Sequence, residues 1–321
     1  NTAPVNDHAG VTKLILQKAA EAGLAQVYPI GAVSMGSKGE HLTEIGELRS
    51  AGCVAISDDG HPVADALMMR RALEYASMFH IPVINHCEDL SLTLGGVMHE
   101  GWVSTRLGLP GCPAAAEESM MARDISLAEL TNGRLHLAHV TTAGGVELVR
   151  RAKERGLNVT AEVTPHHLTM THEWAMGFYG NDKARNGPLT TSAYDARTKV
   201  NPPLRTRQDV ESLIDGLNRG IIDTIATDHA PHALTDKQVT FEEAAVGFSL
   251  LETALGSLLG LVHQGHIDLP TMVHRLTVAP SQVMGGRFSK LASLRPGTPA
   301  DVVLFDPKKE WTVDTNYFAS K

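Results

Sequence analysis

Histidine and aspartate residues recur where short apolar segments of this sequence end. Four such ends read Ser57-Asp58-Asp59-Gly60, Asn85-His86-Cys87-Glu88-Asp89, His136-Leu137-Ala138-His139 and Thr227-Asp228-His229-Ala230-Pro231-His232. Imidazole nitrogens and carboxylate oxygens gathered at one place are the ligands that zinc prefers. Zinc lowers the pKa of a bound water to about 7, and a carboxylate nearby can then act as general base. The pattern therefore predicts a hydrolytic zinc centre.

Each of these residues also has a simpler interpretation when taken alone. A single histidine such as His139 at a strand end is commonly held by local hydrogen bonds. Asp58-Asp59-Gly60 is by itself a turn signal. The conjunction favours a site, because four strand ends of one predicted sheet carry ligand-type residues together. His8, His61, His80 and His99 lack this placement, and no role is assigned to them.

Strands and helices that would position these residues alternate along the chain. The six expected strands are short, almost continuously apolar runs: Ala25–Ala32, Cys53–Asp58, Pro82–Cys87, Leu135–Val140, Asn158–Thr164 and Thr224–His229. Continuous rather than alternating apolar runs are typical of parallel strands covered on both faces. Between them, apolar residues recur at the helical period, as in Val210, Leu213 and Leu217.

Repeated strand–helix units suit either an open doubly wound sheet or a closed (β/α)8 barrel. A glycine-rich phosphate loop does not follow the first expected strand, which favours the barrel, whose chemistry lies at the carboxyl ends of its strands. Six units leave two missing, and Asn1-Thr2-Ala3-Pro4 reads as a loop. We expect the first two strands to precede residue 1, a barrel over residues 1–285, and an edge of a small β-sandwich domain over 286–321, with β-like segments at 301–305 and 311–313.

Composition excludes several other classes of protein. The net charge of -8 argues against a nucleic-acid-binding face, which needs a basic patch. From the residues given we expect neither a membrane-spanning segment nor a signal peptide. Three cysteines do not make a disulfide framework, so a reducing cytoplasm is the expected compartment. Residues 174–203 are rich in glycine and proline, and we expect a functional loop there.

The sequence resembles the amidohydrolase superfamily and, within it, the dihydroorotase family. The stretches that carry the resemblance, over nearly the whole chain, are Ser57-Asp58-Asp59-Gly60, Asn85-His86-Cys87-Glu88-Asp89, His139-Val140-Thr141-Thr142, Thr164-Pro165-His166-His167-Leu168, Val200-Asn201-Pro202-Pro203-Leu204-Arg205 and Thr227-Asp228-His229-Ala230-Pro231-His232. The resemblance implies a TIM-like (β/α)8 barrel, one or two zinc ions, and reversible interconversion of N-carbamoyl-L-aspartate and L-dihydroorotate in pyrimidine biosynthesis. It also implies a homo-oligomer and, as a candidate partner, aspartate carbamoyltransferase.

The resemblance also implies roles for individual residues. Asp59 matches a metal-ligating, bridging carboxylate, and His86 and His139 match two histidine ligands. Asp228 matches the catalytic aspartate, which contacts a metal and transfers protons. Three further residues match positions that hold the substrate: Asn1, Asn201 and His232. His166 matches no ligand and is interpreted as structural, while Glu88 and His136 are left without a role.

One motif of the family does not occur in these 321 residues. The family's His-x-His-x-Arg supplies two ligands of the first metal and an arginine for the substrate, so this chain alone would have an incomplete site. Either a preceding segment supplies the motif, or the site is degenerate. Two other functions stay open: a dihydropyrimidinase, hydantoinase or allantoinase, whose bridging ligand is a carboxylated lysine where this chain has Asp58-Asp59, and a non-catalytic subunit of aspartate carbamoyltransferase.

Overall fold

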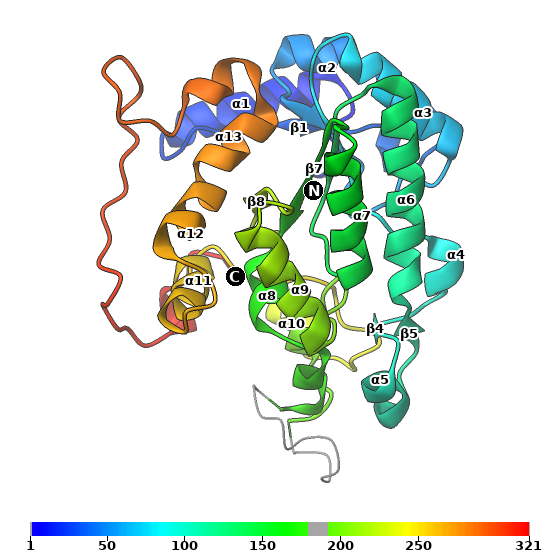
Figure 1. Ribbon diagram of the computed structural model, residues 1–321, viewed down its shortest axis with the longest axis vertical. Coiled ribbons are helices and arrows are strands. Elements are labelled where there is room, and N and C mark those ends of the chain that lie inside the picture. The colour runs from blue at the N-terminus through cyan, green and yellow to red at the C-terminus, as the bar shows by residue number, and fades with distance from the viewer. Residues whose placement is uncertain (1, 179–191, 321) are drawn as a thin grey trace.

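Six parallel strands form one sheet in the computed structural model, which describes residues 2–178 and 192–320 (Figure 1). The sheet order is β1-β2-β3-β6-β7-β8, and every pairing is parallel. Their bounds are β1 Ile30–Gly31, β2 Ala55–Ile56, β3 Val83–Asn85, β6 Leu135–Leu137, β7 Val159–Val163 and β8 Thr224–Ile225. All six predicted strands are confirmed, with shorter bounds, because only residues paired with a neighbouring strand count as strand.

Helices connect successive strands, as parallel pairing requires. The crossovers contain α3 (Ala66–Ser77), α6 (Ala114–Thr131), α7 (Ala143–Glu154) and α9 (Arg207–Asn218). Each packs on the next along the chain, α3 on α6, α6 on α7 and α7 on α9, so that they form an outer layer around the strands (Figure 1). Side chains such as Val83, Leu135 and Val159 fill the core between the two layers.

Local sequence signals explain where these helices begin. Asp65 accepts a hydrogen bond from the backbone N–H of Met68 and so caps α3. Thr142 caps α7 by accepting from Gly145 N–H. Thr206 and Asp209 form a reciprocal capping box at α9. Thr142 lies three residues after His139, and Thr206 directly follows residues 201–205, which we call the Asn201 segment. These two N-caps therefore also fix the chain next to predicted site residues.

The remaining elements surround this sheet. They are α1 (Ala9–Ala22), η1 (Met35–Ser37), α2 (Ile45–Ala51), α4 (Leu90–Thr93), β4 (Met98–His99), α5 (Trp102–Leu107), β5 (Gly111–Cys112), α8 (Pro165–Thr169), η2 (His172–Met176), η4 (Ala196–Thr198), α10 (Leu234–Lys237), α11 (Ala254–His263), α12 (Leu269–Leu276), α13 (Val278–Met284), η5 (Gly286–Lys290) and η6 (Thr315–Tyr317). The parallel pair β4 and β5 was not predicted.

Across the described ranges, no helix combines the length and the apolar character that crossing a bilayer requires. All three cysteines are buried and free.

The expected strands at 301–305 and 311–313 are absent from the described residues. The segment between η5 and η6 instead runs as an extended chain outside α12 and α11 (Figure 1). Val303 and Leu304 are 79% and 98% exposed. A strand needs a neighbour for its backbone hydrogen bonds, and none lies beside this segment in the described chain. The domain boundary at residue 286 stays a prediction, and residues 179–191 of the expected loop lie outside the described ranges.

Candidate metal centre

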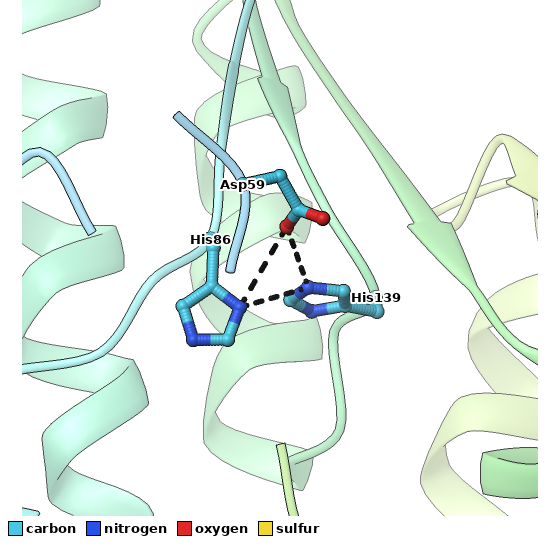
Figure 2. Close-up of side chains that lie close together, drawn as sticks. All are labelled: Asp59, His86 and His139. Atoms are coloured by element: carbon cyan, nitrogen blue, oxygen red, sulfur yellow. Dashed lines mark hydrogen bonds and ion pairs between the residues drawn. The ribbon is translucent and has the colours of Figure 1, made fainter. Parts of the chain in front are cut away.

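Three predicted ligands meet at the carboxyl ends of adjacent strands (Figure 2). Asp59 follows β2, His86 follows β3 and His139 follows β6. His86 Nδ1 lies 3.0 Å from His139 Nε2, and Asp59 Oδ1 lies 3.2 Å from His139 Nε2 and 3.7 Å from His86 Nδ1. Both imidazoles are buried, whereas the Asp59 side chain is 40% exposed. The sheet order thus brings together residues that are far apart in the sequence.

These three atoms fit a zinc ion. Two imidazole nitrogens and one carboxylate oxygen lie within 4.8 Å of one another, and this donor set is typical of zinc. Tetrahedral zinc with bonds of about 2.0–2.2 Å spaces its ligand atoms about 3.3–3.6 Å apart, close to the spacings in this triangle. Three protein ligands also leave a position for water or substrate, as catalytic zinc sites do.

The Asp59 carboxylate and the His139 imidazole shift each other's pKa toward the charged forms. Burial alone would raise the pKa of Asp59, but the hydrogen bond and charge of His139, together with the charge of His86, hold it well below its usual range. Burial alone would lower the pKa of His139, but the bond to Asp59, with the charges of Asp59 and Asp228, raises it to about 9. Zinc would bind the neutral form of the His139 imidazole, so protonation of this ring and metal binding compete.

Glu88 orients His86 from the side opposite the triangle, and the sequence interpretation left it out. Its Oε2 lies 3.0 Å from His86 Nε2 and accepts a hydrogen bond of 2.8 Å from Asn201 Nδ2. Burial would raise the pKa of Glu88, but these bonds lower it to about 2. An ionised carboxylate on Nε2–H leaves Nδ1 free to face the ligand triangle. The signal was the motif itself, since Glu88 stands two residues after His86.

Asp228 lies at the same end of the sheet, after β8. It lines a cavity of about 690 Å³ with Asp59, His136, His139 and Glu162. Burial raises its pKa, and the charges of Asp59 and Glu162 raise it further, while His139 acts in the opposite direction. The structure thus places Asp228 next to the triangle, although it is not one of the three mutually close ligand atoms.

Two site residues have unusual backbone conformations. His139 and Asp228 have φ angles of 32° and 48°, in the left-handed region that non-glycine residues seldom adopt. Such conformations cost about 1–3 kcal/mol and cluster at functional sites. They turn the chain sharply at the strand ends, where side chains can face the cavity.

Glu162 and His136 form a second pair in the cavity, which sequence reasoning missed. His136 Nε2 lies 3.0 Å from Glu162 Oε2, and His136 Nδ1 lies 2.8 Å from Thr160 Oγ1. Glu162 belongs to β7, whose side chains alternate between buried and partly exposed. That alternation within the strand was the signal that could have marked Glu162 as facing inward.

The other residues singled out in the sequence have different surroundings. Asn201 contacts Glu88 and lies 3.4 Å from His86 Nε2. His232 donates from Nε2 to the Val246 carbonyl at 2.8 Å and is not among the residues lining the cavity. Asn1 lies outside the described residues. His166 is buried, and its two ring nitrogens have no hydrogen-bond partner among the residues the structure describes.

Known proteins with similar sequences are dihydroorotases. The family model described as dihydro-orotase-like matches residues 1–144. A dihydroorotase of Anaeromyxobacter sp. (strain K) is 51% identical over 321 residues, covering 100% of this chain and 70% of the relative. A dihydroorotase of Acetivibrio thermocellus is 49% identical over 322 residues, covering 100% of this chain and 71% of the relative.

Solved structures confirm the barrel fold. An L-hydantoinase (dihydropyrimidinase) from Arthrobacter aurescens superposes with a TM-score of 0.75 at 20% identity, over 93% of this chain and 65% of that chain. A dihydropyrimidinase from Brevibacillus agri gives 0.67 at 20% identity, over 97% and 73%. The present chain thus spans about two thirds of the hydantoinase length. The predicted amidohydrolase-type barrel is confirmed as the fold of these relatives.

Proposed function

This chain belongs to the dihydroorotase family, and we propose that its protein catalyses the reversible interconversion of N-carbamoyl-L-aspartate and L-dihydroorotate. The family consists of cyclic amide hydrolases that act in pyrimidine biosynthesis. The observation that carries the proposal is the convergence of Asp59, His86 and His139 within 4.8 Å at one end of the sheet. A metal ion held by such a triangle would activate water for attack on a stable ring amide.

Zinc is the proposed metal, with Asp59, His86 and His139 as ligands. Bound there, zinc would supply Lewis acidity for attack of water on an amide carbonyl. His86 is held for this role by Glu88, and His139 by the turn that follows β6. Whether one or two ions bind depends on further ligands, for which the resemblance proposes a His-x-His-x-Arg segment.

Asp228 is the proposed general base and acid. In the hydrolytic direction, water adds to the ring carbonyl carbon, and Asp228 accepts the proton that the water loses. The bond between that carbon and the ring nitrogen then breaks, and Asp228 returns the proton to the leaving nitrogen. Its raised pKa suits both halves of this transfer, because a carboxyl group whose pKa lies nearer neutrality can donate as well as accept.

Substrate contacts are proposed for Asn1, Asn201 and His232 on the family resemblance. Asn201 lies beside the metal ligand His86, since its amide reaches both Glu88 and His86. We also propose, from the resemblance, a cytoplasmic homo-oligomer with aspartate carbamoyltransferase as candidate partner.

The test is turnover of dihydroorotate against hydantoin by the full-length protein loaded with zinc. The proposal expects hydrolysis of dihydroorotate and little of hydantoin. Preference for hydantoin would assign the chain to the hydantoinase type, whose members share the barrel. A protein that neither retains zinc nor turns over either ring would be the non-catalytic subunit.

A further inference from the structure

One buried carboxylate contacts the loop that carries a metal ligand. Glu117 lies in α6 and is 4% exposed. Its Oε1 accepts hydrogen bonds from the backbone N–H groups of Thr141 at 2.8 Å and Thr142 at 3.3 Å. Its Oε2 accepts a short hydrogen bond from the Thr141 hydroxyl. Because Thr141 is two residues after His139, these bonds fix the chain directly beyond that ligand.

A buried guanidinium contacts the same carboxylate from a different segment. Arg205 is 3% exposed, and its Nη2 lies 3.5 Å from Glu117 Oε2. Its Nε donates to the Thr141 hydroxyl at 3.0 Å, which closes a triangle of three side chains. Its Nη1 donates to the Cys112 carbonyl at 3.0 Å and to His99 Nδ1 at 3.1 Å. Burial, with the charge of Arg205 second, lowers the pKa of His99 to about 4, so this ring is neutral and accepts.

Arg205 ends the segment that starts with Asn201. The backbone of that segment is therefore tied to the His139 loop through Glu117, and Asn201 in turn donates to the Glu88 carboxylate that orients His86. One charged pair thus connects the surroundings of both imidazole ligands. Neither Glu117 nor Arg205 lines the cavity that contains Asp59 and Asp228, so the pair does not contact what binds there, and its hydrogen bonds connect it to the site through these loops.

We propose that Glu117 and Arg205 are positioning residues, which hold the His139 loop and the Asn201 segment in the register needed for metal binding. The inference rests on the proposed metal centre. The alternative is a core ion pair that contributes to folding alone. The two differ in one respect: a positioning pair must affect metal affinity in variants that remain folded.

The experiment measures zinc affinity by chelator competition in full-length Glu117→Gln protein. Glutamine keeps the size of the side chain but turns an amide N–H toward Arg205 or the Thr141 hydroxyl. We expect zinc affinity to fall roughly 10- to 100-fold, the usual loss when a group supporting a metal ligand is changed. Glu129→Gln is the matched control, because Glu129 lies on the same helix, is half-exposed and pairs with Arg155 at the surface. It should bind zinc as the wild type does.

Two further variants decide the matter if Glu117→Gln does not fold. The double variant Glu117→Leu/Arg205→Met replaces a buried ion pair by apolar groups, a change that often preserves folding. Thr141→Val removes only the hydroxyl shared by the pair. Weakened zinc binding in whichever variant is folded supports the proposal, and wild-type zinc affinity there overturns it. Because affinity is read without turnover, a wild type that binds zinc but leaves dihydroorotate intact would defeat the proposed function and not this inference.

Discussion

Replacing Asp228 by asparagine separates proton transfer from metal binding. Asparagine has nearly the same volume, so no cavity is created, and it tolerates the left-handed backbone that Asp228 adopts at φ 48°. The three mutually close ligand atoms belong to other residues, so zinc should still bind. The amide cannot accept and return the proton of the attacking water. We expect kcat for dihydroorotate to fall by about 10²–10⁴-fold, which corresponds to about 2.7–5.4 kcal/mol of barrier.

Although Asp228→Asn should lower kcat, it should not lower the folding stability of the metal-free protein. Burial, with the neighbouring Asp59 and Glu162 carboxylates, raises the pKa of Asp228, so its ionised form opposes folding of the metal-free protein at neutral pH. Metal-free Asp228→Asn should therefore be at least as stable as the wild type. Asp228→Ala, which must hold a left-handed conformation without a polar side chain, should be less stable by about 1 kcal/mol.

The assay compares steady-state turnover, zinc content and urea denaturation for these variants. Asp215→Asn is the control, because Asp215 is exposed on α9 and pairs with Arg219, and exposed pairs contribute only about 0–1 kcal/mol. An Asp228→Asn protein with normal zinc content and near-normal kcat would refute the assignment of the proton transfer. Loss of zinc together with activity would instead make Asp228 a necessary ligand.

Three other predictions concern stability. Burial lowers the pKa of His99 to about 4, against about 6.5 in the unfolded chain, so the neutral ring stabilises the fold fully above pH 6.5 and this stabilisation is lost as the pH falls toward 4. Between pH 7.5 and 5.5, urea titrations should therefore show a fall in the free energy of unfolding that is about 1 kcal/mol larger in the wild type than in His99→Asn. A Cβ at Gly96 would lie 2.5 Å from Cys112 Sγ, so Gly96→Ala should lower the free energy of unfolding by about 1–3 kcal/mol, whereas Gly260→Ala, with open space in α11, should raise it by about 0.5–1 kcal/mol. Zinc at 100 times its Kd should stabilise the native protein by about 2.7 kcal/mol, and a chelator should reverse this in a thermal melt; a melting temperature indifferent to zinc would argue against a structured site.

The strands were predictable because their apolar runs are continuous. The core residues of these two paired strands are Leu135, Leu137, Val159, Ala161 and Val163, and their β-branched and apolar side chains mark the strands in the sequence. The segment 301–305 has the same composition but does not form a strand, since pairing depends on a neighbour that a local pattern cannot show. β4 and β5 were not predicted, because Met98–His99 and Gly111–Cys112 do not lie in a continuous apolar run.

The metal triangle was predictable because parallel strands align their carboxyl ends. That rule places Asp59, His86 and His139 at one edge from their position after apolar runs alone. The rule gives no information on residues within a strand or helix, so Glu162 in β7 could be marked only by the alternation of its own strand, and Glu117 in α6 required the fold. It also did not separate Glu88 from an ordinary turn residue, since its role depends on Asn201, which is distant in sequence.

The most direct test of the metal centre is anomalous diffraction at the zinc absorption edge from crystals of the full-length protein. The account predicts a peak within about 2.0–2.2 Å of Asp59 Oδ1, His86 Nδ1 and His139 Nε2. A fully loaded protein whose zinc lies away from these three atoms would contradict it.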